Sequence, residues 1–293
     1  MAPAPYPSPT PTWHTTTYPS ISPTRPELSA KGKSVLVTGG GTGIGAATAL
    51  HFAEAGASRI ALLGRREQPL LDTKAAIEHK FAGVEVFIAS TDVTKKSEVD
   101  AAFAKFAGDQ KIDVLLSNAA MTGPHDVVTA DADGVGMLDA VHQNLSGSLF
   151  VAQAFLRHAA KDSVAIDVNS AAAHLNFIPS MASYHIAKIA VYRLWDFLAY
   201  TNPDVSVFHI QPGVVDTDMN RKAGGVATVG HSDDVSLPAS FNVWLASPEA
   251  RFLKNKFLWV NWDVDELKAQ AKEIEASARL SIQVVGWPFE NAS

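Results

Sequence analysis

Short apolar runs alternate along the chain with longer stretches of helical spacing, from residue 33 onward. The apolar runs predict seven strands, at 34–38, 59–63, 84–90, 112–117, 163–168, 205–210 and 257–261. The stretches between and after them predict helices at 43–56, 69–81, 95–106, 134–158, 181–200 and 267–278. Such alternation is typical of a mostly parallel sheet with helices on both faces. The pattern therefore predicts an α/β fold with a doubly wound, seven-stranded sheet in a single domain.

Residues 1–30 differ in composition from the rest of the chain. Half of the sixteen prolines fall there, mixed with Ser, Thr and the aromatic residues Tyr6, Trp13 and Tyr18. Such a segment is expected to be extended, or disordered at its start. The simplest interpretation is an arm that is solvated or lies on the surface of a domain formed by residues 31–293, and a docking role for Trp13 or Tyr18 is the alternative.

Charge and composition exclude several classes of protein. A net charge of −6 without a long basic run argues against a nucleic-acid partner. The absence of cysteine excludes disulfides and thiolate catalysis. No apolar stretch reaches the length of a membrane span, and the N-terminus lacks a signal-peptide pattern, so we expect a cytoplasmic protein without membrane contact. The ten histidines show no metal-ligand spacing, so no metal site is expected.

The first predicted strand leads through a glycine-rich turn directly into a helix. Gly39 would allow the chain to turn at positive φ, and Gly45 would let the helix pack closely against the strand. Gly43 would let a phosphate approach the backbone, where the helix N-terminus offers unpaired N–H groups. A turn in this context predicts a dinucleotide site, which would include Thr42 and Ile44.

In open sheets of this kind the ligand lies beyond the carboxyl ends of the strands. Arg65 lies twenty residues past Gly45, where an NAD site has an acid for the ribose 2′-hydroxyl. Because a guanidinium suits a 2′-phosphate, Arg65 favours NADP(H) over NAD(H), and Arg66 is a weaker candidate. Asp92 could accept a hydrogen bond from the adenine amino group or cap the next helix. Asn118 and the small residues after it would let a ribose or nicotinamide pass close by.

A second group of candidate residues follows the fifth predicted strand. Tyr184 and Lys188 are spaced i, i+4 and therefore share one helical face. A neighbouring ammonium favours the phenolate form of a tyrosine, which makes it a better acid and base at neutral pH. Ser170 ends the strand and could bond a carbonyl oxygen as charge builds on it. The pair itself is not specific, and its place behind a nucleotide loop is what supports an active site.

Taken together, residues 33–262 resemble the short-chain dehydrogenase/reductase family. The resemblance rests on six motifs: Thr38-Gly39-x-x-x-Gly43-x-Gly45, Asn118-Ala-Ala, Asn144 in Gln-Asn-Leu-Ser-Gly, Ser170, Tyr184-x-x-x-Lys188 and Pro212-Gly213-Val214-x-x-Thr217. It implies a Rossmann-type fold, NAD(P)-dependent redox chemistry at a carbonyl or alcohol carbon, and a homodimer or homotetramer. The Pro-rich arm and the C-terminal tail look similar to fungal members.

The family also implies roles for individual residues. Tyr184 would be the general acid in reduction, Lys188 would hold the nicotinamide ribose, and Ser170 would orient the substrate carbonyl. Asn144 would anchor a water that links Lys188 to solvent, and Thr217 would contact the cofactor. The other residues expected at the cofactor are Val93, Pro212, Gly213 and Val215.

Three features depart from the family pattern. Ser170 lies fourteen residues before Tyr184, one more than is usual, and Ala171 occupies the usual position. Ser170 is retained because strand alternation places Ile166 and Val168 inward, so that one extra residue in the loop 171–183 explains the spacing. The Asn118-Ala-Ala motif lacks the common final glycine. Bulky residues 258–263 replace a small, glycine-ended turn, and with the tail 282–289 they put the usual tetramer contact in doubt.

The segments expected beside the nicotinamide are apolar and indicate a moderately apolar small-molecule substrate. They contribute His174, Phe177, Met181 and Met219, with Met121 and Val214 nearby. His174 and His185 are more typical of pocket walls than of extra acids. The leading hypothesis is an NADPH-dependent reductase, or the reverse alcohol dehydrogenase. The alternatives are a lyase, isomerase or cyclase without net redox, or a non-catalytic cofactor-sensing protein.

Overall fold

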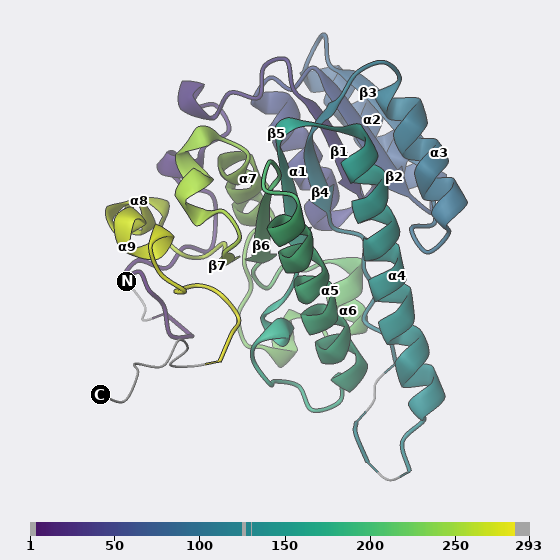
Figure 1. The fold of residues 1–293 in the computed structure, drawn as a ribbon, viewed down its shortest axis with the longest axis vertical. Coiled ribbons are helices and arrows are strands. Elements are labelled where there is room, and N and C mark those ends of the chain that lie inside the picture. The colour runs from purple at the N-terminus through teal and green to yellow at the C-terminus, as the bar shows by residue number, and fades with distance from the viewer. Residues whose placement is uncertain (1–3, 125–126, 130, 285–293) are drawn as a thin grey trace.

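The computed structural model of the chain describes residues 4–124, 127–129 and 131–284 (Figure 1). Its centre is a seven-stranded sheet in the order β3-β2-β1-β4-β5-β6-β7, with every neighbouring pair parallel. The strands are β1 Ser34–Thr38, β2 Arg59–Gly64, β3 Glu85–Ser90, β4 Ile112–Ser117, β5 Ala159–Val168, β6 Ser206–Gln211 and β7 Phe257–Trp259. The predicted doubly wound, Rossmann-type sheet is therefore confirmed.

Two layers of helices cover the sheet and bury its apolar strands on both faces. Helices α1, α2 and α7 share one core with the sheet, in which Phe52 and Trp244 are fully buried. Helices α3, α4 and α5 share the other core, which contains Phe155 and Trp195. The helices are α1 Gly43–Glu54, α2 Glu67–Lys80, α3 Lys96–Ala107, α4 Gly134–His158, α5 Ala182–Thr201, α6 Asp218–Lys222, α7 Ser236–Leu245, α8 Val264–Ala269 and α9 Ala271–Glu275.

Two element boundaries differ from those that periodicity predicts. Strand β5 begins at Ala159 rather than 163, because Ala159 pairs with Ile112 across an irregularity in the register that the apolar pattern does not reveal. The predicted closing helix 267–278 is two short helices, α8 and α9, and begins earlier. The Asp263 side chain accepts hydrogen bonds from the backbone N–H groups of Asp265 and Glu266 and so starts helix α8 at Val264.

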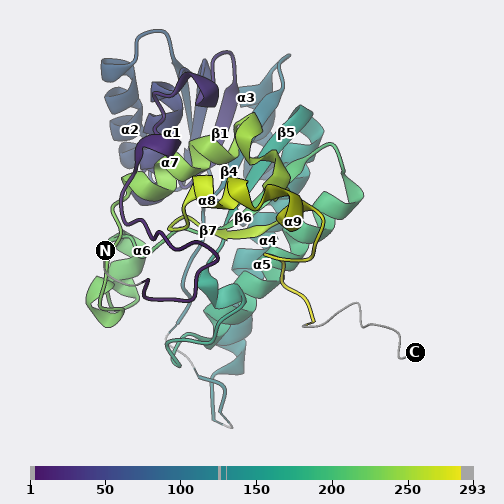
Figure 2. The same ribbon diagram turned by 90° about the vertical axis from the view of Figure 1, so that its left-hand side faces the viewer.

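The arm lies on the surface of the fold rather than in solvent, and much of it packs along the C-terminal part of the chain (Figure 2). Trp13 forms an antiparallel bridge with Trp262, and the His14 ring lies 2.8 Å from the Asp263 carboxylate. The Tyr18 hydroxyl donates to the carbonyl of Trp262 and accepts from the N–H of Val264 at 2.9 Å. Trp13 and Tyr18 therefore make their contacts with the C-terminal part of the same chain.

Aromatic contacts explain the bulky residues that replace the usual glycine-ended turn. The Trp259 ring centroid lies 5.1 Å from that of Tyr6 and 6.0 Å from that of Trp13.

Burial raises the pKa of Tyr18 well above its ordinary value, so its hydroxyl stays a protonated donor. Residues 1–3, and residues 285–289 of the predicted tail, lie outside the described residues.

Replacing Ile21 with alanine should destabilise the whole domain by about 2–5 kcal/mol, because its fully buried side chain makes the arm part of the main core. The measurement is the midpoint of thermal or urea unfolding. Thr15→Ala is the matched control in the arm, since Thr15 is exposed and such changes stay within about 0.5 kcal/mol. An Ile21→Ala midpoint equal to that of Thr15→Ala would show that the arm adds nothing to stability.

Within the described ranges, no helix combines the length and the apolar character that crossing a bilayer requires.

Candidate active site

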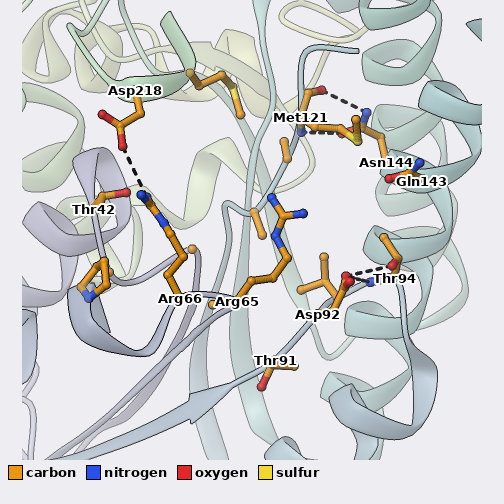
Figure 3. Close-up of a pocket in the computed structure, with 18 of the residues that line it drawn as sticks. Thr42, Arg65, Arg66, Thr91, Asp92, Thr94, Met121, Gln143, Asn144 and Asp218 are labelled. Carbon is orange, nitrogen blue, oxygen red and sulfur yellow. Dashed lines mark hydrogen bonds and ion pairs between the residues drawn. The ribbon is translucent and has the colours of Figure 1, made fainter. Parts of the chain in front are cut away.

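A cavity of about 530 Å³ lies beside the neighbouring strands β1 and β4, where the strand order of the sheet reverses. Figure 3 shows the side chains that line it. Segments that follow β1, β2, β3 and β4 line it, so it opens at the carboxyl edge of the sheet, as in other doubly wound folds. Of the residues singled out from the sequence, those that line it are Gly39, Thr42, Arg65, Arg66, Asp92, Val93, Ala119, Ala120, Met121, Asn144 and Met219.

The glycine-rich turn has the geometry that its sequence predicts. Gly39 adopts φ of +69°, which only glycine adopts without strain. A Cβ at Gly45 would lie 2.2 Å from the carbonyl oxygen of Gly39, so no other residue fits where helix α1 meets strand β1. The first turn of α1 is therefore held close to the end of β1, with its N–H groups directed at the edge of the sheet.

Thr38 and Asn118 join the ends of β1 and β4 beside this turn. The Thr38 hydroxyl accepts hydrogen bonds from the backbone N–H groups of Asn118 at 2.9 Å and Ala119 at 3.1 Å. The Asn118 side chain donates to the Thr38 carbonyl at 2.9 Å. Asn118 thus stabilises the turn, while the small side chains of Ala119 and Ala120 line the cavity.

The two arginines after β2 differ in their partners. Arg66 lies 3.3 Å from the carboxylate of Asp218, and both side chains are largely exposed. Arg65 points into the cavity, between Met121 and Asp92 (Figure 3). Its guanidinium forms no ion pair with any residue that the structure describes. Arg65 is therefore the better placed of the two to meet an anionic group of a ligand.

Asp92 shapes the loop after β3 rather than capping the next helix. Its carboxylate accepts hydrogen bonds from the N–H of Thr94 at 3.0 Å and the Thr94 hydroxyl at 2.8 Å, whereas Lys95 occupies the N-cap of α3. Burial opposes ionisation of Asp92, but these hydrogen bonds and the nearby charge of Arg65 hold its pKa below the ordinary value. The capping interpretation is wrong, and an ionised carboxylate faces the cavity.

Asn144 of α4 is bound to the loop that follows β4. Its Oδ1 accepts from the N–H of Met121 at 3.0 Å, and its Nδ2 donates to the carbonyls of Met121 at 3.1 Å and Ala140 at 2.9 Å. The side chain therefore fixes the backbone at Met121, one wall of the cavity. The water-anchoring role that the family implies stays a prediction.

Tyr184 and Lys188 meet at the start of α5, on one face of the helix as predicted. The Lys188 Nζ lies 5.6 Å from the centroid of the Tyr184 ring and donates to the carbonyl of Val168, the last residue of β5, at 2.9 Å. Ser170 is buried, and its hydroxyl oxygen accepts from the N–H of Ala172 at 3.2 Å. All three residues thus gather at the carboxyl end of β5.

These three side chains do not line the 530 Å³ cavity, but α5, which carries Tyr184 and Lys188, begins beside it. Gly123 lines the cavity, and a Cβ added there would lie 2.8 Å from the hydroxyl of Ser183, the residue before Tyr184. The first turn of α5 therefore lies directly behind one wall of the cavity, at Gly123.

The predicted substrate-side residues do not all face the same space. His174 accepts a hydrogen bond from the Trp259 indole at 3.2 Å, and burial lowers the pKa of His174, so it is a neutral acceptor rather than an acid. Phe177 is partly exposed and packs edge-on against His185. Met181 is buried, and Met219 alone of the four predicted residues lines the cavity.

The loop after β6 is held from both sides. Thr217 caps α6 by accepting from the N–H of Asn220, and a Cβ at Gly43 would lie 3.0 Å from the Thr217 methyl group. The Val214 N–H donates to the buried Asp233 carboxylate at 2.7 Å, and Asn261 donates to the same carboxylate at 2.9 Å. Of the predicted cofactor residues in this loop, Thr217 therefore lies beside the glycine turn, whereas Pro212, Gly213 and Val215 do not line the cavity.

Sequence reasoning missed several residues of the cavity. The ones with polar side chains are Thr91, Thr94, Thr122, Gln143, Asp218 and Lys222. Asp218 and Lys222 are spaced i, i+4 on α6. A helix of five residues is too short to be predicted from a periodic pattern of apolar residues. The only available signal was adjacency, since Gln143 precedes Asn144 and Asp218 follows Thr217.

Comparison with known proteins agrees with this geometry. Residues 33–225 match the family model described as short chain dehydrogenase. A protein of Claviceps purpurea named short chain dehydrogenase/reductase is 33% identical over 279 residues, which cover 93% of this chain and 92% of that protein. Sorbose reductase of Schizosaccharomyces pombe is 34% identical over 204 residues, 67% of this chain and 78% of that protein.

The fold also matches solved structures. The crystal structure of a Burkholderia cenocepacia short chain dehydrogenase in complex with NADP superposes with a TM-score of 0.71 at 23% identity. The superposition covers 80% of this chain and 99% of that one. Identity at this level shows that the fold is shared.

Proposed function

Because this chain belongs to the short chain dehydrogenase/reductase family, we propose that it is an NADPH-dependent reductase, or the reverse alcohol dehydrogenase, of a small molecule. The observation that carries the proposal is the Tyr184–Lys188 pair at the end of β5, next to a cavity that begins at the glycine turn. The family is one of oxidoreductases.

The residues present fit a nicotinamide dinucleotide. The Gly39–Gly45 turn brings the N-terminus of α1 to the edge of the sheet, where its N–H groups can bind a pyrophosphate. The cavity has the size of small-molecule sites, about 300–1,000 Å³. Arg65 would bind the 2′-phosphate and Asp92 the adenine amino group. A bound nicotinamide supplies or accepts the hydride.

In reduction, Tyr184 donates a proton to the substrate oxygen as negative charge develops on it. The Lys188 ammonium, 5.6 Å from the ring, stabilises the phenolate that results. Ser170 can orient the same oxygen, because its Oγ accepts from Ala172 while its hydrogen remains available for donation. Met121 and Met219 line the cavity and favour a moderately apolar substrate. The likeness to a protein named sorbose reductase supports chemistry at a carbonyl or alcohol carbon.

The test is a screen of carbonyl compounds for NADPH oxidation, in which the loss of nicotinamide absorbance is measured. Turnover of at least one ketone or aldehyde is the expected result. NADPH binding without turnover of any carbonyl class would overturn the proposal and favour a lyase, an isomerase or a cofactor sensor on the same fold.

We expect the chain to form a homodimer or larger assembly through α4 and α5, which pack together and leave apolar side chains exposed. These include Leu149, Leu156, Ile186, Ile189 and Phe197. Ile189→Glu should lower the mass measured by light scattering toward that of the monomer. The control is Leu71→Glu, a similarly exposed leucine on α2. A monomeric wild-type protein would contradict the expectation.

A further inference from the structure

A buried polar cluster lies behind the candidate catalytic residues. It consists of Asp167 on β5, Asn169 directly after that strand, and His209 on β6, with exposures of 1%, 2% and 0%. Asp167 and His209 are direct register partners in the sheet, and Nδ1 of His209 lies 3.1 Å from Oδ2 of Asp167. The Asn169 Nδ2 donates to the same carboxylate oxygen at 2.7 Å. The carboxylate thus has two donors away from solvent.

The Asn169 amide also contacts the backbone of two candidate catalytic residues. Its Oδ1 accepts from the N–H of Ser170 at 2.9 Å, and its Nδ2 donates to the carbonyl of Lys188 at 3.3 Å. One side chain therefore joins the end of β5 to the second turn of α5, where Lys188 lies four residues past Tyr184. A rotation of this amide would disturb Ser170 and Lys188 together.

The carboxylate determines which way the amide faces. If Asn169 were flipped, its oxygen would face two acceptors, the Asp167 carboxylate and the Lys188 carbonyl, and its NH₂ group would face the N–H of Ser170. Asp167 therefore selects one orientation of Asn169, and His209 in turn holds Asp167. The orientation of Asn169, and with it the contact to Lys188 on α5, thus depends on Asp167 of β5 and on His209 of β6.

Stability alone does not account for this cluster. Its neighbours along β5, Ala165, Ile166 and Val168, are apolar. A buried charged group of this kind is often no more stabilising than well-packed apolar residues of similar volume. What an apolar replacement could not supply is the directed set of hydrogen bonds to Ser170 and Lys188.

We propose that His209, Asp167 and Asn169 are positioning residues that keep Ser170 and Lys188 in a fixed relation to Tyr184. The inference rests on the proposed function, since it concerns the same redox site. Misplacement of a reacting group by about 1 Å can cost up to a hundredfold in rate. Loss of the unit should therefore lower kcat by on the order of tenfold while leaving the fold intact.

The variants are Asn169→Ala, the nearly isosteric Asp167→Asn, His209→Leu and His209→Asn. The last places an amide donor near the position of the imidazole Nδ1 and should restore activity that His209→Leu loses, although it leaves a cavity. The matched control is Asn242→Ala, because Asn242 is equally buried and donates to Thr48 at 3.1 Å between α7 and α1. Each protein is measured for kcat, KM, melting temperature and hydrogen exchange.

The proposal is supported if Asn169→Ala and Asp167→Asn lower kcat by about tenfold, and by more than the control does at equal melting temperature. It also requires that His209→Asn regain activity that His209→Leu loses. Losses no larger than that of Asn242→Ala would overturn the proposal. Hydrogen exchange of residues 170–173 and 182–190 provides a readout without turnover. Faster exchange in Asp167→Asn than in Asn242→Ala supports positioning, and exchange equal to that of the wild type contradicts it.

The same series separates this inference from the proposed function. If the wild type and Tyr184→Phe turn over carbonyl compounds equally, or neither does, the proposed function fails and the exchange data alone decide on positioning. If Tyr184→Phe is inactive and the cluster variants match Asn242→Ala, only the positioning role fails.

Discussion

Replacing Tyr184 with phenylalanine should lower carbonyl turnover by about 10²–10⁴-fold, because the variant lacks the phenol hydroxyl that is proposed to donate the proton to the substrate oxygen. The ring remains, so packing at the start of α5 should be unchanged. Binding of NADPH should survive, since the proposed cofactor contacts lie mainly on the glycine turn and Arg65. The measurement is kcat with an accepted ketone, together with the NADPH dissociation constant from fluorescence.

Tyr200→Phe is the matched control for this variant. Tyr200 lies on the same helix but is 80% exposed, so removal of its hydroxyl should change neither kcat nor cofactor binding. Undiminished turnover by Tyr184→Phe would remove Tyr184 from the proton-transfer role.

Replacing Arg65 with aspartate should weaken NADPH binding by about a hundredfold and NADH binding far less. A hydrogen bond to a charged group contributes about 1.5–3 kcal/mol, and each 1.4 kcal/mol corresponds to tenfold in affinity. The new carboxylate would also stand near that of Asp92, whose low pKa depends in part on the Arg65 charge. The two carboxylates would repel the negatively charged 2′-phosphate of NADPH, a group that NADH lacks. Dissociation constants for both cofactors, measured by fluorescence, give the ratio.

Arg66→Asp makes the same change of charge at the neighbouring position and therefore tests whether the effect is specific to position 65. Arg66 also lines the cavity, but its guanidinium pairs with Asp218 at 3.3 Å and is largely exposed. A smaller change in the NADPH-to-NADH ratio is expected there. Equal losses of NADPH and NADH affinity in Arg65→Asp would place Arg65 outside the 2′-phosphate site.

Local pattern sufficed for the sheet and for two parts of the candidate site. Strand and helix periods are properties of a few neighbouring residues, which is why all seven strands could be predicted. The turn at Gly39 and the close approach at Gly45 follow from the same local logic. The pairing of Tyr184 with Lys188 needs only one helical turn. Asp92 was ambiguous because its partner, Thr94, is equally typical of a turn and of a helix start.

The arm shows where local pattern stops being informative. Its prolines predict an extended chain, and residues 4–30 contain little regular structure besides two short 3₁₀ turns, 19–21 and 26–28. Whether such a segment is solvated depends on partners far along the chain. Trp13 and His14 find theirs at Trp262 and Asp263, and no spacing rule connects residues so distant.

The burial of Asp167, Asn169 and His209 also depends on tertiary structure. Both faces of β5 are covered, so apolar alternation favoured Ile166 and Val168 as inward residues but did not show that Asp167 and Asn169 are buried as well. His209 is recognised as a partner only when β5 and β6 lie in register.

By itself, the sequence determined the order of the elements, the glycine turn and the family to which the chain belongs, because each depends on residues close together or on motifs in a set order. Only the tertiary structure decided that the arm is part of the core, that His174 faces Trp259, and that Asp167 meets His209. The reason is physical: burial and partner choice for a polar or aromatic side chain depend on which distant segments the fold brings within a few ångströms of it.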